Sequence, residues 1–315
     1  MASQPFQADL LPIAVTVRPR IRVTPLWCAL GLLITIDAVW LLASPLRLSA
    51  DSWRVLAGLL PLAVIGGWGA HRLGDHPRLH MLCRGVAFML IAWPALRLYN
   101  HLTMSTALPF ADNWLAAGDA FIGFDWMRYA LWLDSHPGLI QLMDYSYSGL
   151  TTYSIVLFVM LLLGREPIQR CEELVVLFFS SALICSTMGM FFPAEAAALH
   201  YQVQRDLFRN VDPWVGTYHI HHLLALRVEP DHVFALNNLP GLVTFPSFHT
   251  AMGVIAIYCA RGTPWLFWPS VMVNVVMIAS TPLLGSHYLI DVIAGAGVAA
   301  GAILFLRLYR PRLVV

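Results

Sequence analysis

The sequence predicts an all-α integral membrane protein with about eight transmembrane helices. Of its 315 residues, 58% are hydrophobic and only 12% are charged. Soluble domains carry a charged fraction of roughly 25%. Eight apolar segments are long enough, or nearly so, to cross about 30 Å of hydrocarbon. Unpaired backbone groups are costly in lipid, so we expect these segments to be helices.

The expected spans divide the chain into accessory helices, a core, two long loops and two tails. In chain order the spans cover residues 26–46, 53–70, 81–99, 139–163, 174–192, 247–260, 266–284 and 287–306, of which the sixth is the shortest. We expect two accessory helices within 26–80 and a six-helix core within 81–307. The long loops cover 100–137 and 193–246, and the tails cover 1–25 and 308–315.

The distribution of arginine predicts the orientation in the membrane. Arginines gather in both tails and in the second, fourth and sixth loops: Arg18, Arg20, Arg22, Arg72, Arg78, Arg84, Arg165, Arg170, Arg261, Arg307, Arg310 and Arg312. Eight spans place all of these on one side. Short loops rich in arginine stay in the cytoplasm. We therefore expect both termini in the cytoplasm and the two long loops on the outer face.

Charge and cysteine usage exclude other classes of protein. The net charge of +1 shows no basic excess that would indicate binding to nucleic acid. The five cysteines lie in or beside apolar runs, and no CxxC occurs. Neither a disulfide framework nor a zinc knuckle is therefore indicated.

The segment 285–295 carries two residues that a membrane span does not need, His287 and Asp291. Four residues apart on a helix, they would lie on one face. The carboxylate would then accept a hydrogen bond from one imidazole nitrogen and leave the other as nucleophile or base. Ser286 is positioned to cap this helix, and Tyr288 is a candidate substrate-binding residue.

A second polar cluster, Phe-Pro-Ser-Phe-His-Thr at 245–250, opens the sixth span. Pro246 suits the first turn of a helix, and a helix start favours an anion such as phosphate. Ser247 and His249 would lie beside that anion. One histidine attacking phosphorus and another protonating the leaving oxygen is a chemically sensible division of roles.

Two further elements bring polar residues to the same expected face. Arg97 and Asn100 end the third span, and Asp144 lies near the outer end of the fourth. Ionisable groups in a membrane are rare unless they face a bundle interior or a site. We therefore add these three to the candidate substrate-binding residues. Two alternatives stay open: Arg97 could extend to the membrane interface by snorkelling, and Asp144 could pair with an arginine.

The two clusters resemble known motifs. Phe-Pro-Ser-Phe-His at 245–249 and His-Tyr-Leu-Ile-Asp at 287–291 resemble the second and third signature motifs of the type 2 phosphatidic acid phosphatase superfamily. Ser-Thr at 280–281, Ile-Ala-Gly at 293–295 and the stretch 113–126 resemble its inositol phosphorylceramide synthase branch. The resemblance covers roughly residues 112–300.

The resemblance implies a catalytic mechanism. His287 matches the nucleophile that becomes phosphohistidine, Asp291 the carboxylate that orients it and His249 the acid for the leaving group. Ser247 matches a phosphate-binding hydroxyl. The implied substrate is a lipid phosphate or diphosphate in the bilayer, and the acceptor is water or an alcohol on a polyol or second lipid. No cofactor and no metal are expected.

The chain departs from the superfamily pattern at its cationic positions. The first motif, Lys-x6-Arg-Pro, has no match, and Thr281 stands where the third motif usually has arginine. Arg97 is the candidate substitute, with Arg205 and Arg209 as alternatives. The missing cations keep open a second class of function, a non-catalytic lipid-binding or transport protein.

The tract Tyr-His-Ile-His-His at 218–222 has the composition of a metal site. His219 and His222 would share a helix face, with His221 between them. No cysteine or acid accompanies them, whereas zinc needs three or four ligands. We expect an interfacial helix that covers the site.

Overall fold

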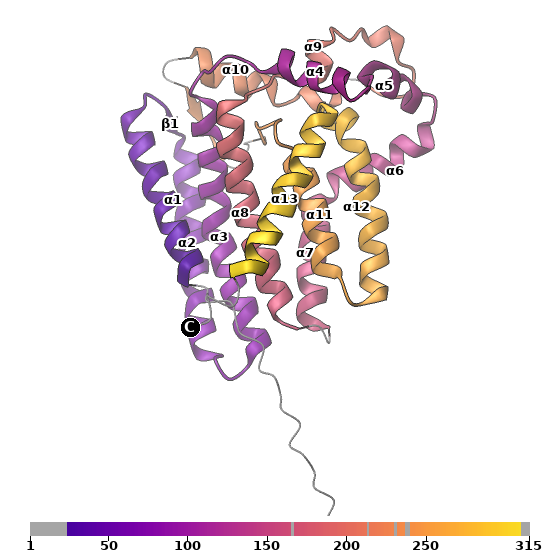
Figure 1. The fold of residues 1–315 in the computed structure, drawn as a ribbon. Coiled ribbons are helices and arrows are strands. Elements are labelled where there is room, and N and C mark those ends of the chain that lie inside the picture. The colour runs from indigo at the N-terminus through magenta and orange to yellow at the C-terminus, as the bar shows by residue number, and fades with distance from the viewer. Residues whose placement is uncertain (1–23, 165–166, 213, 230–231, 237–239, 310–315) are drawn as a thin grey trace, which may run out of the picture.

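The computed structural model describes residues 24–309 except 165–166, 213, 230–231 and 237–239. It is a bundle of long helices closed at one end by short helices that lie across it (Figure 1). The predicted tails fall almost entirely outside the described residues. The all-α fold is confirmed, with one small addition: strands β1 (Arg47–Leu48) and β2 (Val233–Phe234) pair in parallel.

Among the described residues, six helices are long and apolar enough to span a membrane. They are α1 (Thr24–Ala43), α2 (Ala50–Arg72), α3 (Pro77–Met104), α8 (Gln169–Phe191), α12 (Pro264–Leu284) and α13 (Leu289–Tyr309). The sixth predicted span is α11 (Phe248–Ala260), whose 13 residues cover only about 20 Å.

The fourth predicted span is not one helix. It consists of α6 (Pro137–Ser148) and α7 (Leu150–Leu163), which meet at an angle of 60° and together would make a seventh span. The chain turns at Gly149, where an added Cβ would lie 2.6 Å from the Tyr145 carbonyl oxygen. The sequence pattern could not show this break, because both halves are apolar enough to continue each other.

The short helices form a cap over one end of the bundle (Figure 1). They are α4 (Asp112–Phe121), α5 (Trp126–Asp134), α9 (Ala197–His200), η1 (Arg205–Leu207), η2 (Val215–Thr217) and α10 (Ile220–Val228). All lie in the two predicted outer loops. Helix α1 begins and α13 ends at the opposite end, so the described chain enters and leaves on one side.

The bundle is apolar inside and outside. Phe88 on α3 packs edge-on against Trp27 of α1 and Phe179 of α8, with ring centroids 5.2 and 5.4 Å apart. The outer surface of α2 exposes large apolar side chains, among them Leu60, Val64 and Trp68. A helix surface of this kind is stable in lipid and not in water. The chain is therefore an integral membrane protein.

Hydrogen bonds to backbone groups attach the cap to the bundle. The buried Trp126 donates its indole N–H to the Pro282 carbonyl at 2.9 Å, and the Tyr129 hydroxyl donates to the Ala279 carbonyl at 2.6 Å. Both bonds tie α5 to the end of α12. Within the cap, the Asp134 carboxylate accepts the backbone N–H groups of residues 209–211.

Helices α11 and α13 meet at their starts. The backbone N–H of Ser247 donates to the Asp291 carbonyl at 3.0 Å. A Cβ added at Gly295 would lie 2.2 Å from the Ser247 carbonyl oxygen, so only glycine permits this approach. The two predicted polar clusters are therefore brought together by backbone contact.

We expect Gly295→Ala to destabilise the protein, because the new methyl group would collide with a backbone carbonyl that no rotamer change can move. Overpacking of this kind costs about 1–3 kcal/mol. Thermal unfolding in detergent measures it. Gly297→Ala on the same helix is the matched control, since nothing lies within 4 Å of its added Cβ. Equal melting temperatures for the two variants would contradict the close approach.

Candidate active site

His287 and Asp291 form a hydrogen-bonded pair at the start of α13. His287 Nδ1 lies 3.2 Å from Asp291 Oδ2, and the pair is almost completely buried. The predicted geometry was wrong in one respect: His287 lies in the connection before α13, whose first residue is Leu289. Asp291 Oδ2 also accepts the Tyr288 N–H at 3.0 Å, as an acidic residue in the first turn does in a capping box.

This pair engages Nδ1 of His287, so Nε2 is the ring nitrogen that Asp291 leaves unbound. The carboxylate fixes the ring orientation and favours the Nδ1–H tautomer. His287 lines a large cavity. The Ser286 hydroxyl accepts the Ala198 N–H at 2.9 Å, so Ser286 does not cap α13 as predicted.

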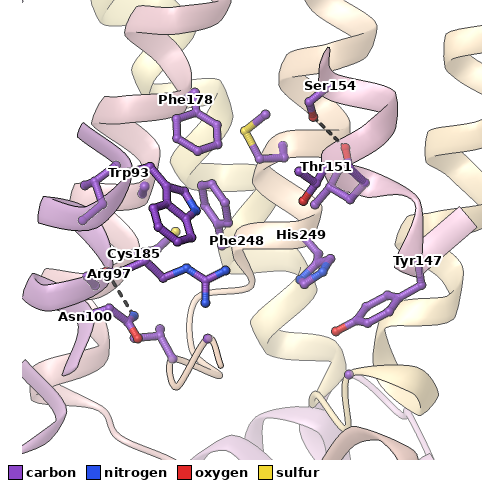
Figure 2. A pocket seen from close by; sticks show the side chains of 18 of the residues that line it. Trp93, Arg97, Asn100, Tyr147, Thr151, Ser154, Phe178, Cys185, Phe248 and His249 are labelled. Carbon is purple, nitrogen blue, oxygen red and sulfur yellow. Dashed lines mark hydrogen bonds between the residues drawn. The ribbon is translucent and has the colours of Figure 1, made fainter. Parts of the chain in front are cut away.

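His249 is the second residue of α11 and lines the same cavity. Its ring stacks on Tyr147 with centroids 4.2 Å apart and planes 9° from parallel. Tyr147 lies near the end of α6, just before the bend, and Figure 2 shows its ring directed toward His249. Sequence reasoning missed Tyr147, whose only signal was its place one helical turn from Asp144.

Ser247 is the N-cap residue of α11 rather than part of the cavity wall. Its hydroxyl accepts the Thr250 N–H at 3.4 Å and the Thr250 hydroxyl at 3.2 Å, and the residue is fully buried. Pro246 precedes this cap and does not lie in the first helical turn, where the sequence placed it. The Ser247 side chain therefore supports the helix that carries His249.

The cavity has a volume of about 1050 Å³, one polar end and a long apolar part. Its polar end contains Arg97, Asn100, Asp144, Tyr147, His219, His249 and His287. Its apolar part follows α3, α7 and α8. Along α3 it extends from Asn100 to Gly85, about 22 Å at 1.5 Å per residue. One leaflet of hydrocarbon is about 15 Å thick, so the cavity is longer than a leaflet.

Arg97 is the single arginine among the described residues that line the cavity, and the sequence contains no lysine. Figure 2 shows its side chain extending from α3 toward His249. Its guanidinium carbon lies 5.3 Å from the centroid of the Trp93 ring. The alternatives Arg205 and Arg209 are exposed in the cap and do not line the cavity; Arg205 lies 3.5 Å from Asp212.

The other predicted substrate-binding residues have different surroundings. Asn100 donates to the Ser186 hydroxyl at 3.2 Å and accepts the Leu242 N–H at 3.1 Å, so its amide ties α3 to α8 and to the segment that precedes α11. Asp144 is exposed and accepts the Ser148 hydroxyl at 3.3 Å. Tyr288 is fully buried behind the cavity wall, with its hydroxyl 2.8 Å from Asp112 Oδ1.

His219 belongs to the cavity wall, although the sequence suggested only a covering helix for its tract. It is buried at the start of α10, and its Nε2 lies 3.0 Å from the Glu195 carbonyl oxygen. Burial is the main cause that lowers the pKa of His219 to about 4. In the part of the chain that the structure describes, no group of three or more His, Cys, Asp or Glu side chains could hold a metal ion.

Comparison with known proteins adds the family. A family model described as the PAP2 superfamily matches residues 113–305, more than half of the chain. The chain belongs to the PAP2 superfamily. The match to the PAP2 superfamily includes His249, His287 and Asp291, and Arg97 lies before it. It indicates a phosphatase or phosphotransferase of lipid phosphates and selects no branch.

The comparison with curated proteins and the comparison with solved structures each give no significant match.

The buried His219 should make the stability of the protein depend on pH. Its folded pKa of about 4 lies below the ordinary value of 6.5, so between these values only the unfolded chain binds the proton. Stability is therefore lost as pH falls from 6.5 to 4. We expect His219→Gln to melt with a weaker pH dependence across this range. His221→Gln, at the exposed neighbouring position, should behave like the parent protein.

Proposed function

We propose that the chain is a membrane enzyme that transfers a phosphoryl group or a phospho-headgroup from a lipid phosphate or diphosphate through a phosphohistidine at His287. One observation carries the proposal. Two histidines from distant elements, one of them paired with a carboxylate, meet at the polar end of a cavity whose remaining wall is apolar. Such a cavity suits a molecule with a phosphate at one end and a hydrocarbon chain at the other.

The first chemical step forms the phosphoenzyme. The Nε2 lone pair of His287 attacks phosphorus, the bond from phosphorus to the lipid oxygen breaks, and protonated His249 gives its proton to that oxygen. His287 keeps its Nδ1 proton, which points to Asp291 at 3.2 Å. The carboxylate stabilises the positive ring that results.

The second step returns both histidines to their starting states. Neutral His249 takes a proton from water or an alcohol, whose oxygen attacks phosphorus while the bond from phosphorus to Nε2 breaks. The product is free phosphate or a new phosphate ester. Water gives a lipid phosphatase, and an alcohol gives an inositol phosphorylceramide synthase-like phosphotransferase.

Arg97 is the proposed phosphate-binding cation, in place of the residues missing from the first and third motifs. Its side chain reaches toward His249 within the cavity, and a guanidinium can donate to two phosphate oxygens at once. The start of α11 adds a helix N-terminus on the same side.

The apolar part of the cavity is the proposed site of the lipid tail. Its walls include Val86, Met89 and Trp93 on α3, Phe158 on α7 and Phe178 on α8. A hydrocarbon chain in this position would stay within the membrane while its phosphate reaches the histidines.

We place the active site at the outer face and both termini in the cytoplasm. The short connections at the end opposite the cap carry arginines, among them Arg72, Arg78 and Arg261. The two long segments that hold the cap, 100–137 and 193–246, contain half of the 18 acidic residues. This asymmetry follows the positive-inside rule.

Phosphate release from a panel of lipid phosphates tests the function. We expect the purified protein to release phosphate from one or more of phosphatidic acid, ceramide 1-phosphate and farnesyl diphosphate, and much less from glycerol 3-phosphate, which has no tail. His287→Asn should abolish turnover and the acid-labile phosphoenzyme. Adding candidate alcohols to the same assay separates transfer from hydrolysis.

The same panel decides between the two classes of function. Equal rates for the parent protein and His287→Asn on every substrate would reject the enzyme and favour the non-catalytic lipid-binding or transport protein. Lipid binding without turnover would then be the activity to measure.

Arg97→Ala should lower kcat/KM by about 100-fold or more, the cost of removing one donor from a site of developing negative charge. Arg97→Lys should recover only part of this loss, because an ammonium lacks the two-pronged geometry of guanidinium. Arg205→Ala is the control, since Arg205 is exposed and outside the cavity. Unchanged turnover in Arg97→Ala would exclude Arg97 as the phosphate ligand.

A further inference from the structure

Helix α4 buries both of its carboxylates and exposes its two largest apolar side chains. Its buried face carries Asp112 and Asp119, 7% and 0% exposed, whereas Trp114 and Phe121 are 82% and 90% exposed. A helix on a water-soluble protein has the opposite arrangement. Buried carboxylates are costly unless they are hydrogen-bonded, so their partners should explain their position.

Those partners are the residues between His287 and Asp291. Asp119 Oδ2 accepts the Leu289 N–H at 3.0 Å, and Asp119 Oδ1 accepts the Ile290 N–H at 2.8 Å. Asp112 Oδ1 accepts the Tyr288 hydroxyl at 2.8 Å, and Asp112 Oδ2 accepts the Glu195 N–H at 3.0 Å. Helix α4 therefore holds three consecutive residues, 288–290.

The N–H groups that donate to Asp119 are the first two of α13. Free N–H groups at a helix start commonly bind phosphate. Here a protein carboxylate accepts two of them and Asp291 accepts the N–H before them. The start of α13 is thus filled from within the protein, and its N–H groups fix backbone geometry instead of binding substrate.

The cap holds the other side of His287 in the same way. Ser286 has a positive φ of 51°, which non-glycine residues seldom adopt. Its carbonyl accepts the Ala197 N–H at 2.8 Å, and its hydroxyl accepts the Ala198 N–H at 2.9 Å. Both neighbours of His287 are therefore fixed by cap residues.

We propose that Asp119 is a positioning residue for the catalytic pair: by holding the N–H groups of Leu289 and Ile290, it fixes the orientation of His287 against Asp291. This inference rests on the proposed function. Asp291 accepts from both the His287 ring and the Tyr288 N–H, so a change in the backbone of 288–290 turns the ring away from the cavity. A misplacement of about 1 Å can cost on the order of 100-fold in rate.

Asp119→Asn is the test. An asparagine has nearly the same volume but can accept only one of the two N–H groups, and its own NH₂ would face the other. We expect kcat to fall on the order of 100-fold with KM little changed, because the phosphate and tail contacts remain. The probe is the most active lipid phosphate from phosphatidic acid, ceramide 1-phosphate and farnesyl diphosphate.

Asp134→Asn is the matched control. Asp134 also lies in the cap and also accepts backbone N–H groups, from residues 209–211, but none of its hydrogen bonds involves residues 287–291. We expect Asp134→Asn to lower the melting temperature about as much as Asp119→Asn does and to leave kcat unchanged. Full kcat in Asp119→Asn, or an equal loss in Asp134→Asn, would overturn the proposal.

Hydrogen exchange separates this proposal from the proposed function. If the parent protein is no faster than His287→Asn on every probe, the proposed function fails. The backbone prediction is still tested, because peptides covering 288–291 should exchange faster in Asp119→Asn than in Asp134→Asn. Equal exchange in the two variants would contradict the role of Asp119 whatever the activity.

Discussion

One backbone contact determines the geometry of the candidate active site. The Ser247 N–H donates to the Asp291 carbonyl at 3.0 Å, and Gly295 leaves room for the Ser247 carbonyl beside α13. This contact joins the starts of two helices that are remote in sequence. His249 and His287 lie on either side of it, so the polar end of the cavity exists only when α11 and α13 are packed together.

The sequence predicted the parts of the protein that depend on composition. Spans with a continuous apolar pattern, such as α8 and α12, were located within a few residues because lipid requires long apolar helices. The sequence did not predict the break at Gly149, where two apolar helices meet at 60°. A bend of this kind depends on packing, and no change of composition marks it.

The sequence predicted which catalytic residues belong to the candidate site better than it predicted how they are arranged. The spacing of His287 and Asp291 identified a pair, but the contact forms across a helix start instead of along a helix face. Ser247 and Tyr288 were expected beside the substrate and are instead buried in supporting hydrogen bonds. Tyr147 and His219 reach the cavity through tertiary packing, which no local motif records.

His287 is buried in a connection rather than in a helix, so the helices can stay folded while the surroundings of His287 change. The bundle is stabilised by apolar packing among long helices, whereas the surroundings of His287 depend on a few hydrogen bonds from the cap. A detergent that loosens the cap would therefore inactivate the protein while its helix content stayed intact. Circular dichroism would be a poor guide to whether a preparation is competent, and a lipid environment that preserves the cap would be the better choice for purification.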